Sequence, residues 1–155
     1  MTLKLVEPTP EPQLIPTSRG CDCKHRPCYR LLSDYFYVDE TTFDEPVVIF
    51  VPAGFHCDLA SVPRLVRPLI EPYELSIIGP FIHDVLYRYA GQLPKGWLLP
   101  DEPPRAYTLR QTDALLKRIM DQEGIPEWRG TVAWLGVRAG GWWSWRKAKR
   151  RWRVS

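Results

Sequence analysis

Four residues in two segments have the types and spacing of a proton-transfer site. The segment Pro80–Tyr89 reads PFIHDVLYRY, so His83 and Asp84 lie inside an apolar and aromatic run. In a helix, His83 and Tyr87 share a face because they are four residues apart, whereas Asp84 is turned about 100° away. A second segment, TDALLKRIM, places Asp113 within another helical apolar pattern. If the two helices pack antiparallel, Asp113 can orient the His83 imidazole, which can then take a proton from water.

A structural role for the same residues is the competing interpretation. A single histidine on an apolar helix is more often a hydrogen-bonded core residue than a catalyst, and buried ionisable pairs point to function only statistically. Asp84 can pair with Arg88 and Asp113 with Lys117, each four residues on. The residues would then form a buried polar network that locks two helices together.

The elements that must position these residues begin with a small sheet. The segments YFYVDE and PVVIFVPAGF are rich in β-branched and aromatic residues, which predicts two strands. The turn DETTFDEP between them indicates a hairpin.

Helices are predicted after the strands. One is expected over about residues 73–90, with Pro80 either in its first turn or at a kink. The next has Thr108 as its cap and Gln111 as the capping-box partner, and Gly124 can end it.

A third helix is expected to start at Pro126 and to break near Gly140–Gly141. We predict an extended N-terminal arm at residues 1–20, a single globular domain at 21–145 and a basic Trp- and Arg-rich tail at 146–155. The fold class is α+β, with a small antiparallel β-sheet (the hairpin) followed by a bundle of about three helices.

The composition is that of one globular domain. A chain of 155 residues, 45% of them hydrophobic, can bury a core without disulfides or metals. The net charge is only +3, so the protein is not basic throughout. No secretory signal and no run of 18 apolar residues is visible, which favours a cytoplasmic protein with reduced cysteines.

One resemblance covers a short part of the chain. HDVLY followed by TDALLKRIM resembles the His-Asp-x-x-Tyr plus distal Asp pattern of phospholipase A2 enzymes, above all the short viral-capsid and prokaryotic forms. The resemblance implies that His83 is the general base and Asp84 a calcium ligand. It also implies that Asp113 is the partner of His83 and that the Tyr87 hydroxyl supports that acid. The Gly-rich calcium loop of those enzymes is not visible, because VPAGFHCDLASVP occupies its place and does not match.

A second resemblance spans about residues 47–145. The blocks VPAGFHCDLASVPR, FIHDVLYRY, RQTDALLKRIM and VAWLGVRAGGWWSW are similar to an uncharacterised family common in tailed phages and prophages. The signature of that family is roughly GF-x-[TS]-D-L-A-S-V-P, H-D-x-L-Y and R-x-x-D. This chain departs from it at Cys57, where Thr is usual, and in a Cys-rich insert. The resemblance implies a phage context but no particular chemistry.

The loop DLASVP adds two candidates. Asp58 either caps a turn or is a further metal ligand or partner of His83. Ser61 is a conceivable nucleophile with His83, although a cap of the following short helix is the simpler role.

The segment CDCKHRPC holds Cys21, Cys23, His25 and Cys28, which together could form a tetrahedral structural zinc site. Cys57, with His56 beside it, could replace one of these ligands. The alternative is a set of reduced loop thiols or a single disulfide.

The segment GGWWSWRKAKRRWR interleaves indoles and cations. Residues 142–153 could lie on an anionic membrane surface or, less favoured, bind nucleic acid. Alternatively Trp142, Trp143 and Trp145 pack on the domain while the cations stay solvated.

Two functions follow. The first is a phage-encoded accessory protein that acts as a small metal-assisted hydrolase, resembling phospholipase A2, on a lipid ester or envelope bond. It would use His83, Asp113 and Tyr87, with calcium at Asp84 and Asp58. The second is a non-enzymatic virion or assembly protein, such as a tail or connector component, whose partners are other virion proteins. Both place the protein in the host cytoplasm during assembly, with a possible place in the virion.

Overall fold

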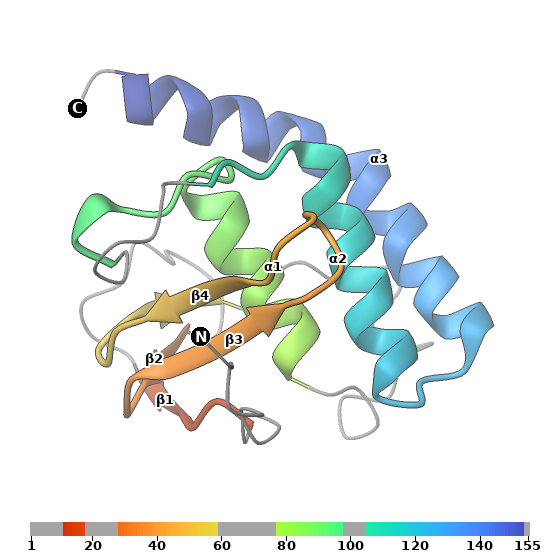
Figure 1. Ribbon diagram of the computed structural model, residues 1–155, viewed down its shortest axis with the longest axis horizontal. Coiled ribbons are helices and arrows are strands. Elements are labelled where there is room, and N and C mark those ends of the chain that lie inside the picture. The colour runs from red at the N-terminus through yellow and green to blue at the C-terminus, as the bar shows by residue number, and fades with distance from the viewer. Residues whose placement is uncertain (1–10, 18–27, 59–76, 98–104, 154–155) are drawn as a thin grey trace.

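The computed structural model describes residues 11–17, 28–58, 77–97 and 105–153. Within them, five strands precede the helices, as expected for the predicted α+β fold. Figure 1 shows α1 (Ile78–Arg88) and α2 (Leu109–Gln122) side by side behind a β-hairpin, with α3 (Glu127–Arg153) along the outer edge of the helical layer. A short 3-10 helix, η2 (Lys95–Trp97), lies between α1 and α2 in the chain.

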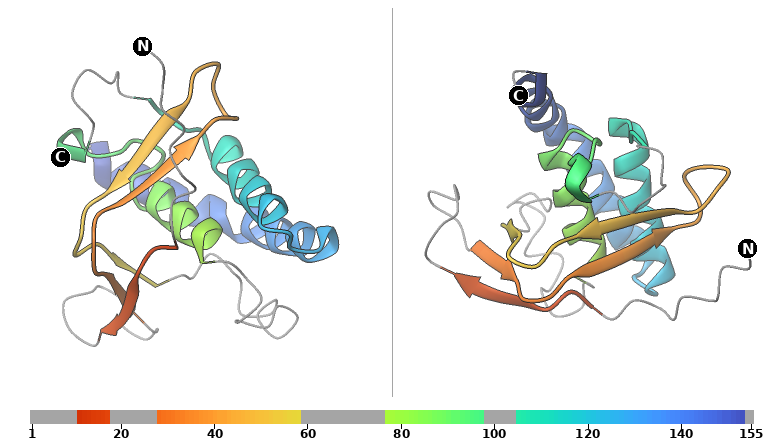
Figure 2. Two further views of the ribbon diagram at one scale, coloured as in Figure 1. Left: turned by 60° about the horizontal axis from the view of Figure 1, so that its bottom comes forward. Right: turned by 60° about the vertical axis from the view of Figure 1, so that its left-hand side comes forward.

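The strands form two antiparallel sheets. The predicted hairpin is confirmed, because β3 (Tyr35–Asp39) pairs with β4 (Val47–Val51) from Tyr35 opposite Val51 to Asp39 opposite Val47. The second sheet has the order β1 (Leu14–Thr17), β2 (Cys28–Leu31), β5 (His56–Cys57). The two sheets and the helices opposite them are seen from two further sides in Figure 2.

The core lies where α1 meets the strands. β4 alternates inward and outward side chains, so Ile49 and Val51 are fully buried. From α1, Phe81 and Val85 are equally buried and belong to the same cluster. The burial of the α1 face holds the helix that carries His83 in a fixed orientation.

The residues predicted to start, cap and end the first two helices have these roles in the structure. Pro80 lies in the first turn of α1, where its missing N–H costs nothing. At α2 the capping box is complete: Gln111 N donates to Thr108 Oγ1 (3.2 Å), and Thr108 N donates to Gln111 Oε1 (2.9 Å). Gly124, with a φ of 74°, takes the left-handed conformation that follows the end of this helix.

The expected helix break at Gly140–Gly141 is wrong. α3 continues without interruption through both glycines to Arg153. A Cβ at Gly141 would lie 2.9 Å from ring atoms of Tyr87 and would overlap its hydroxyl. Gly141 therefore serves the close approach of α3 to α1, and tertiary packing outweighs the low helix propensity of glycine.

The predicted arm and tail both include regular structure. Leu14–Thr17, inside the predicted arm, pairs with β2 as an edge strand. Residues 146–153, inside the predicted tail, are the last turns of α3.

Candidate functional site

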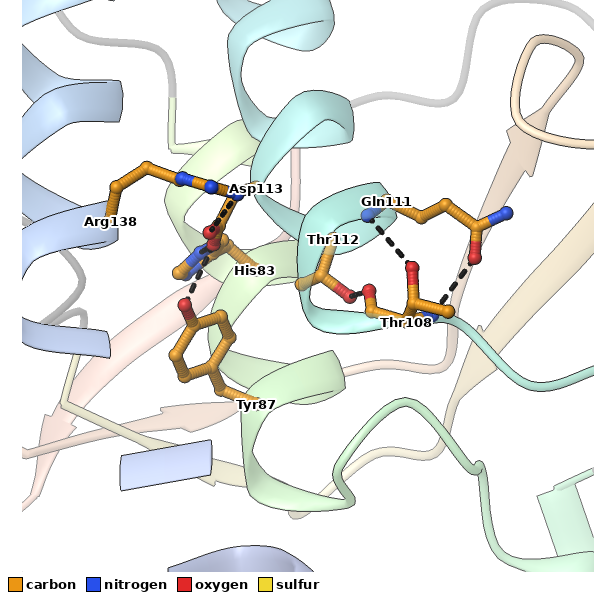
Figure 3. A network of polar contacts seen from close by, with 7 residues as sticks. All are labelled: His83, Tyr87, Thr108, Gln111, Thr112, Asp113 and Arg138. Carbon is orange, nitrogen blue, oxygen red and sulfur yellow. Dashed lines mark hydrogen bonds and ion pairs between the residues drawn. The ribbon is translucent and has the colours of Figure 1, made fainter. Parts of the chain in front are cut away.

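Asp113 is the centre of a buried polar network between α1 and α2 (Figure 3). Its Oδ1 lies 3.0 Å from His83 Nε2 and accepts a hydrogen bond of 2.7 Å from the Tyr87 hydroxyl. His83 is 2% exposed and Asp113 is 1% exposed, so both are withdrawn from solvent. The contact predicted from the spacing of the two helices is present, because His83 and Tyr87 are one turn apart and both face Asp113.

The competing pairing of Asp113 with Lys117 is not the one formed. Lys117 Nζ lies 3.1 Å from Asp121 Oδ2 on the surface of α2. Asp113 instead points inward, toward α1.

The third helix adds a cation to the network. Arg138 on α3 lies with its Nη1 3.8 Å from Asp113 Oδ2, and its side chain is 41% exposed. This ion pair, made to Oδ2, balances part of the Asp113 charge (Figure 3).

Aromatic contacts fix the orientation of Tyr87. Its ring stacks on the His83 imidazole with 4.1 Å between ring centroids, and the buried Trp145 meets it edge-on at 5.2 Å. Gly141 leaves the space in which the Tyr87 hydroxyl sits. α3 thus positions Tyr87 through Trp145 and Gly141, while Tyr87 in turn positions Asp113.

The electrostatics leave His83 neutral with one free lone pair. Burial lowers the pKa of His83 below 6.5, although its hydrogen bond to Asp113 and the charge of Asp113 act in the opposite direction. In the neutral ring Nε2 therefore carries the proton and donates it to Asp113 Oδ1. Nδ1 is then an acceptor, and it has no hydrogen-bond partner among the described residues. The Tyr87 hydroxyl stays a donor because burial, and then its bond to Asp113, raises the pKa of Tyr87.

A cleft of about 500 Å³ opens beside His83. One wall comes from α1 and from the end of β5, and it includes the carboxylates of Asp84 and Asp58. The other wall comes from the second half of α3 and includes Lys147. The cleft therefore combines an imidazole, two carboxylates and cationic side chains within reach of one small ligand.

The predicted site residues fall into two groups. His83, Asp113 and Tyr87 are in direct contact, and Asp84 and Asp58 line the cleft beside them. The remaining loop and cysteine candidates lie outside the described residues: Ser61, Cys21, Cys23 and His25.

The other cysteines are placed. Cys28, at the start of β2, is disulfide-bonded, whereas Cys57 is buried, is not in a disulfide and lines the cleft. A disulfide-bonded Cys28 has no thiolate to give to zinc, so zinc binding by the cysteine segment stays a prediction only with Cys57 in place of Cys28. Within the described ranges no group of three or more His, Cys, Asp and Glu side chains could hold a metal ion.

Three residues of the site were not predicted from the sequence: Arg138, Gly141 and Trp145. All three lie on α3, which was expected to break before Trp145. The signal in the sequence was the glycine pair inside an otherwise helical segment, since a glycine in a helix interior often marks a close contact with a neighbouring element.

A family model described as "Protein of unknown function (DUF1353)" matches residues 29–137. This range includes the blocks that carry His83, Asp84, Tyr87 and Asp113, and it confirms the expected membership of an uncharacterised family. No curated protein and no solved structure matches the chain.

Proposed function

Because the chain belongs to the DUF1353 family, whose function is unknown, we propose a function from the site itself. The protein is a phage-encoded accessory hydrolase in which His83 activates water for attack on a lipid ester or a related envelope bond. The phage context rests on the signature blocks GFHCDLASVP, HDVLY and RQTD.

One observation carries the proposal. His83 Nε2 is held by Asp113, while Nδ1 has no hydrogen-bond partner among the described residues, and His83 lines a cleft. A buried acceptor without a partner costs about 1–3 kcal/mol, so a purely structural histidine would gain from a partner on both nitrogens. A general base needs one nitrogen oriented and the other without a competing partner, and Nδ1, although buried, has no such partner among the described residues.

The chemical step uses the residues in contact. A water molecule in the cleft gives a proton to His83 Nδ1 as its oxygen bonds to the ester carbonyl carbon. The carbonyl π electrons move to the oxygen, and the positive imidazolium is stabilised by Asp113. When the tetrahedral intermediate collapses, the C–O bond to the leaving alcohol breaks and Nδ1–H protonates that alcohol.

Charge on the carbonyl oxygen requires a positive partner. Lys147 and Arg88 line the same cleft and can supply it. Tyr87 and Arg138 act on Asp113, the first by a hydrogen bond and the second by an ion pair, so they position the acid that orients the base.

Calcium at Asp84 and Asp58 remains part of the proposal as a cofactor. Two carboxylates supply at most four of the roughly six to eight oxygens that calcium takes. The described residues therefore fit only part of a calcium shell, and no step above depends on the ion.

The test is release of fatty acid from phosphatidylglycerol vesicles, measured with calcium and with a chelator. We expect His83→Gln to lower the rate by about 10²–10⁴-fold, the usual contribution of a general base. Tyr107→Phe, which lies outside the cleft, is the matched control and should keep the wild-type rate. No release by the wild type, or equal release by a folded His83→Gln protein, would overturn this function.

The second candidate is a non-enzymatic virion or assembly protein, and the near-complete burial of His83 favours it. In that case His83→Ala should lower the free energy of unfolding by about 1–3 kcal/mol, because it removes one of the two short hydrogen bonds to the buried Asp113 carboxylate. The wild type would then turn over no substrate, so the substitution would change stability alone.

A further inference from the structure

The outward face of α3 is apolar over four turns. Trp128, Leu135 and Trp142 follow one another at intervals of seven residues, so they lie along one side of the helix. They are 55%, 54% and 43% exposed, and Trp143 beside them is 74% exposed. We call these four residues the α3 outer stripe. Ala133 and Val137 on the opposite side are buried against the domain, so the stripe faces away from the core.

Some of the cations of α3 lie beside the α3 outer stripe, whereas Arg138, Lys147 and Arg151 face the Asp113 network and the cleft. α3 has eight cationic side chains and a single acidic one, Glu127, although the whole chain has a net charge of only +3. The positive charge is therefore concentrated on this helix. Two guanidinium groups lie directly over indoles of the stripe: Arg146 is 4.3 Å from the Trp142 ring centroid and Arg129 is 5.2 Å from that of Trp128.

α3 is not suited to cross a membrane. In the part of the chain that the structure describes, no helix is both long enough and apolar enough to do so. A helix with exposed Trp and Leu on one side and Lys and Arg around them has the properties of one that lies in the interface of an anionic bilayer. Tryptophan prefers the headgroup level, and each cation there is attracted to anionic lipid.

Other occupants fit the α3 outer stripe less well. A second copy of this helix would bring more cations to the interface, including Arg129 and Arg146, and α3 has only one acidic side chain to pair with them. Nucleic acid would use the cations, but Leu135 in the middle of the stripe has no phosphate or base edge to bind.

We propose that the α3 outer stripe docks the protein on an anionic phospholipid surface. The indoles insert among the headgroups, and the cations of the last turns, such as Lys149 and Arg150, contact lipid phosphates. Hydrolysis is not required for this docking, so the inference stands independently of the function proposed above.

The test is co-sedimentation of the full chain with vesicles of phosphatidylglycerol and phosphatidylcholine, compared with vesicles of phosphatidylcholine alone. We expect binding to the anionic vesicles that weakens as salt is raised. Lys149→Gln combined with Arg150→Gln should weaken it by roughly 25-fold, since each cation near an anionic surface contributes roughly fivefold.

A second pair of variants tests the indoles. Trp128→Ser combined with Trp143→Ser should abolish vesicle binding, because it removes two indoles that insert among the headgroups. Both side chains are exposed, so their loss leaves the core intact. Leu32→Ser is the matched control, since Leu32 is 48% exposed on another part of the molecule, and it should bind as the wild type does.

The docking proposal would be overturned if the wild type did not bind vesicles, or if the double Trp variant bound them as well as the wild type does. It would also be overturned if the wild type were a dimer that binds no vesicles and the double Trp variant were a monomer, because the stripe would then be a dimer interface. Tight binding of duplex DNA with no binding of vesicles would assign the face to nucleic acid instead.

Discussion

Among the described residues, two buried carboxylates lie beside tyrosine hydroxyls, and the two sites differ in how many of their polar atoms have hydrogen-bond partners. Asp39, at the end of β3, accepts on Oδ1 from Thr41 N, Thr41 Oγ1 and Thr42 N at 3.0–3.2 Å. Its Oδ2 accepts from the Tyr107 hydroxyl at 3.0 Å. This Asp39 network joins the hairpin turn to the residue before the α2 cap, and both carboxylate oxygens have partners.

The Asp113 network, made of Asp113, His83, Tyr87 and Arg138, is incomplete by comparison. Oδ1 receives both short hydrogen bonds, whereas the only partner of Oδ2 in the described part of the chain is Arg138, at 3.8 Å. His83 Nδ1 is buried and has no hydrogen-bond partner among the described residues, and His83 lines the cleft.

The difference separates a structural network from a candidate reactive one. Burial alone would raise the pKa of Asp39, but the hydrogen bonds from Thr42, Thr41 and Tyr107 together lower it below its usual value. The Asp39 network therefore has the properties of a structural network that stabilises the fold. The Asp113 network keeps a neutral imidazole with an available lone pair, an arrangement that favours proton transfer over stability.

The largest expected effect is on catalysis by Asp113→Asn. We expect the rate of ester hydrolysis to fall by about 10³-fold, because the amide cannot stabilise the imidazolium form of His83. Fatty-acid release, normalised to folded protein, measures the effect. An unchanged rate would mean that the Asp113 network is as structural as the Asp39 network.

Asp39→Ala should lower the stability of the protein and leave its activity unchanged. It removes four hydrogen bonds to one carboxylate, so we expect the free energy of unfolding to fall by about 3 kcal/mol, measured by urea denaturation. Activity per folded molecule should not change, since Asp39 does not line the cleft. A loss of activity in the folded variant would show that the two networks are coupled.

Gly141→Ala tests the contact by which α3 positions Tyr87. A Cβ here overlaps the Tyr87 hydroxyl, and we expect destabilisation by about 2 kcal/mol as the helices separate. Gly140→Ala is the matched control, because its Cβ would meet nothing within 4 Å. That variant should be more stable than the wild type by up to about 1 kcal/mol, since alanine favours the helix. Equal thermal midpoints for the two variants would contradict the close approach of α3 to α1.

The smallest expected effect is a pH dependence that distinguishes the networks. The pKa of His83 in the folded state is lower than its ordinary value of 6.5, so below that pH the unfolded chain binds more protons. Stability should therefore decrease as the pH falls below 6.5. His83→Gln should remove this slope.

The contribution of Asp39 to stability should be lost at a lower pH than that of His83. The folded-state pKa of Asp39 is lower than 3.8, so its contribution is complete above that pH and is lost as the pH falls through the folded-state pKa. Unfolding measured as a function of pH should show two separate windows in the wild type. A His83→Gln curve that coincides with the wild type above pH 4 would mean that His83 is not held neutral by burial.

The local elements were predictable because their signals lie within a few residues of one another. The hairpin, the Thr108–Gln111 capping box and the placement of Pro80 follow from turn and cap chemistry that needs no distant partner. The contact of His83 with Asp113 was also foreseeable, because each residue is a polar interruption of an apolar helical face and two such faces pack together.

The sequence by itself determined the strands, the helix caps and the face on which His83 and Tyr87 lie, since these depend on backbone preference and on the period of the helix. Only the tertiary structure decided that α3 passes unbroken through Gly140 and Gly141, because the benefit of packing Gly141 on Tyr87 comes from α1, more than 50 residues away in the chain. It also decided that Arg138 and Trp145 join the site and that His83 lines a cleft. Those properties depend on how three helices meet, and no local signal specifies that arrangement.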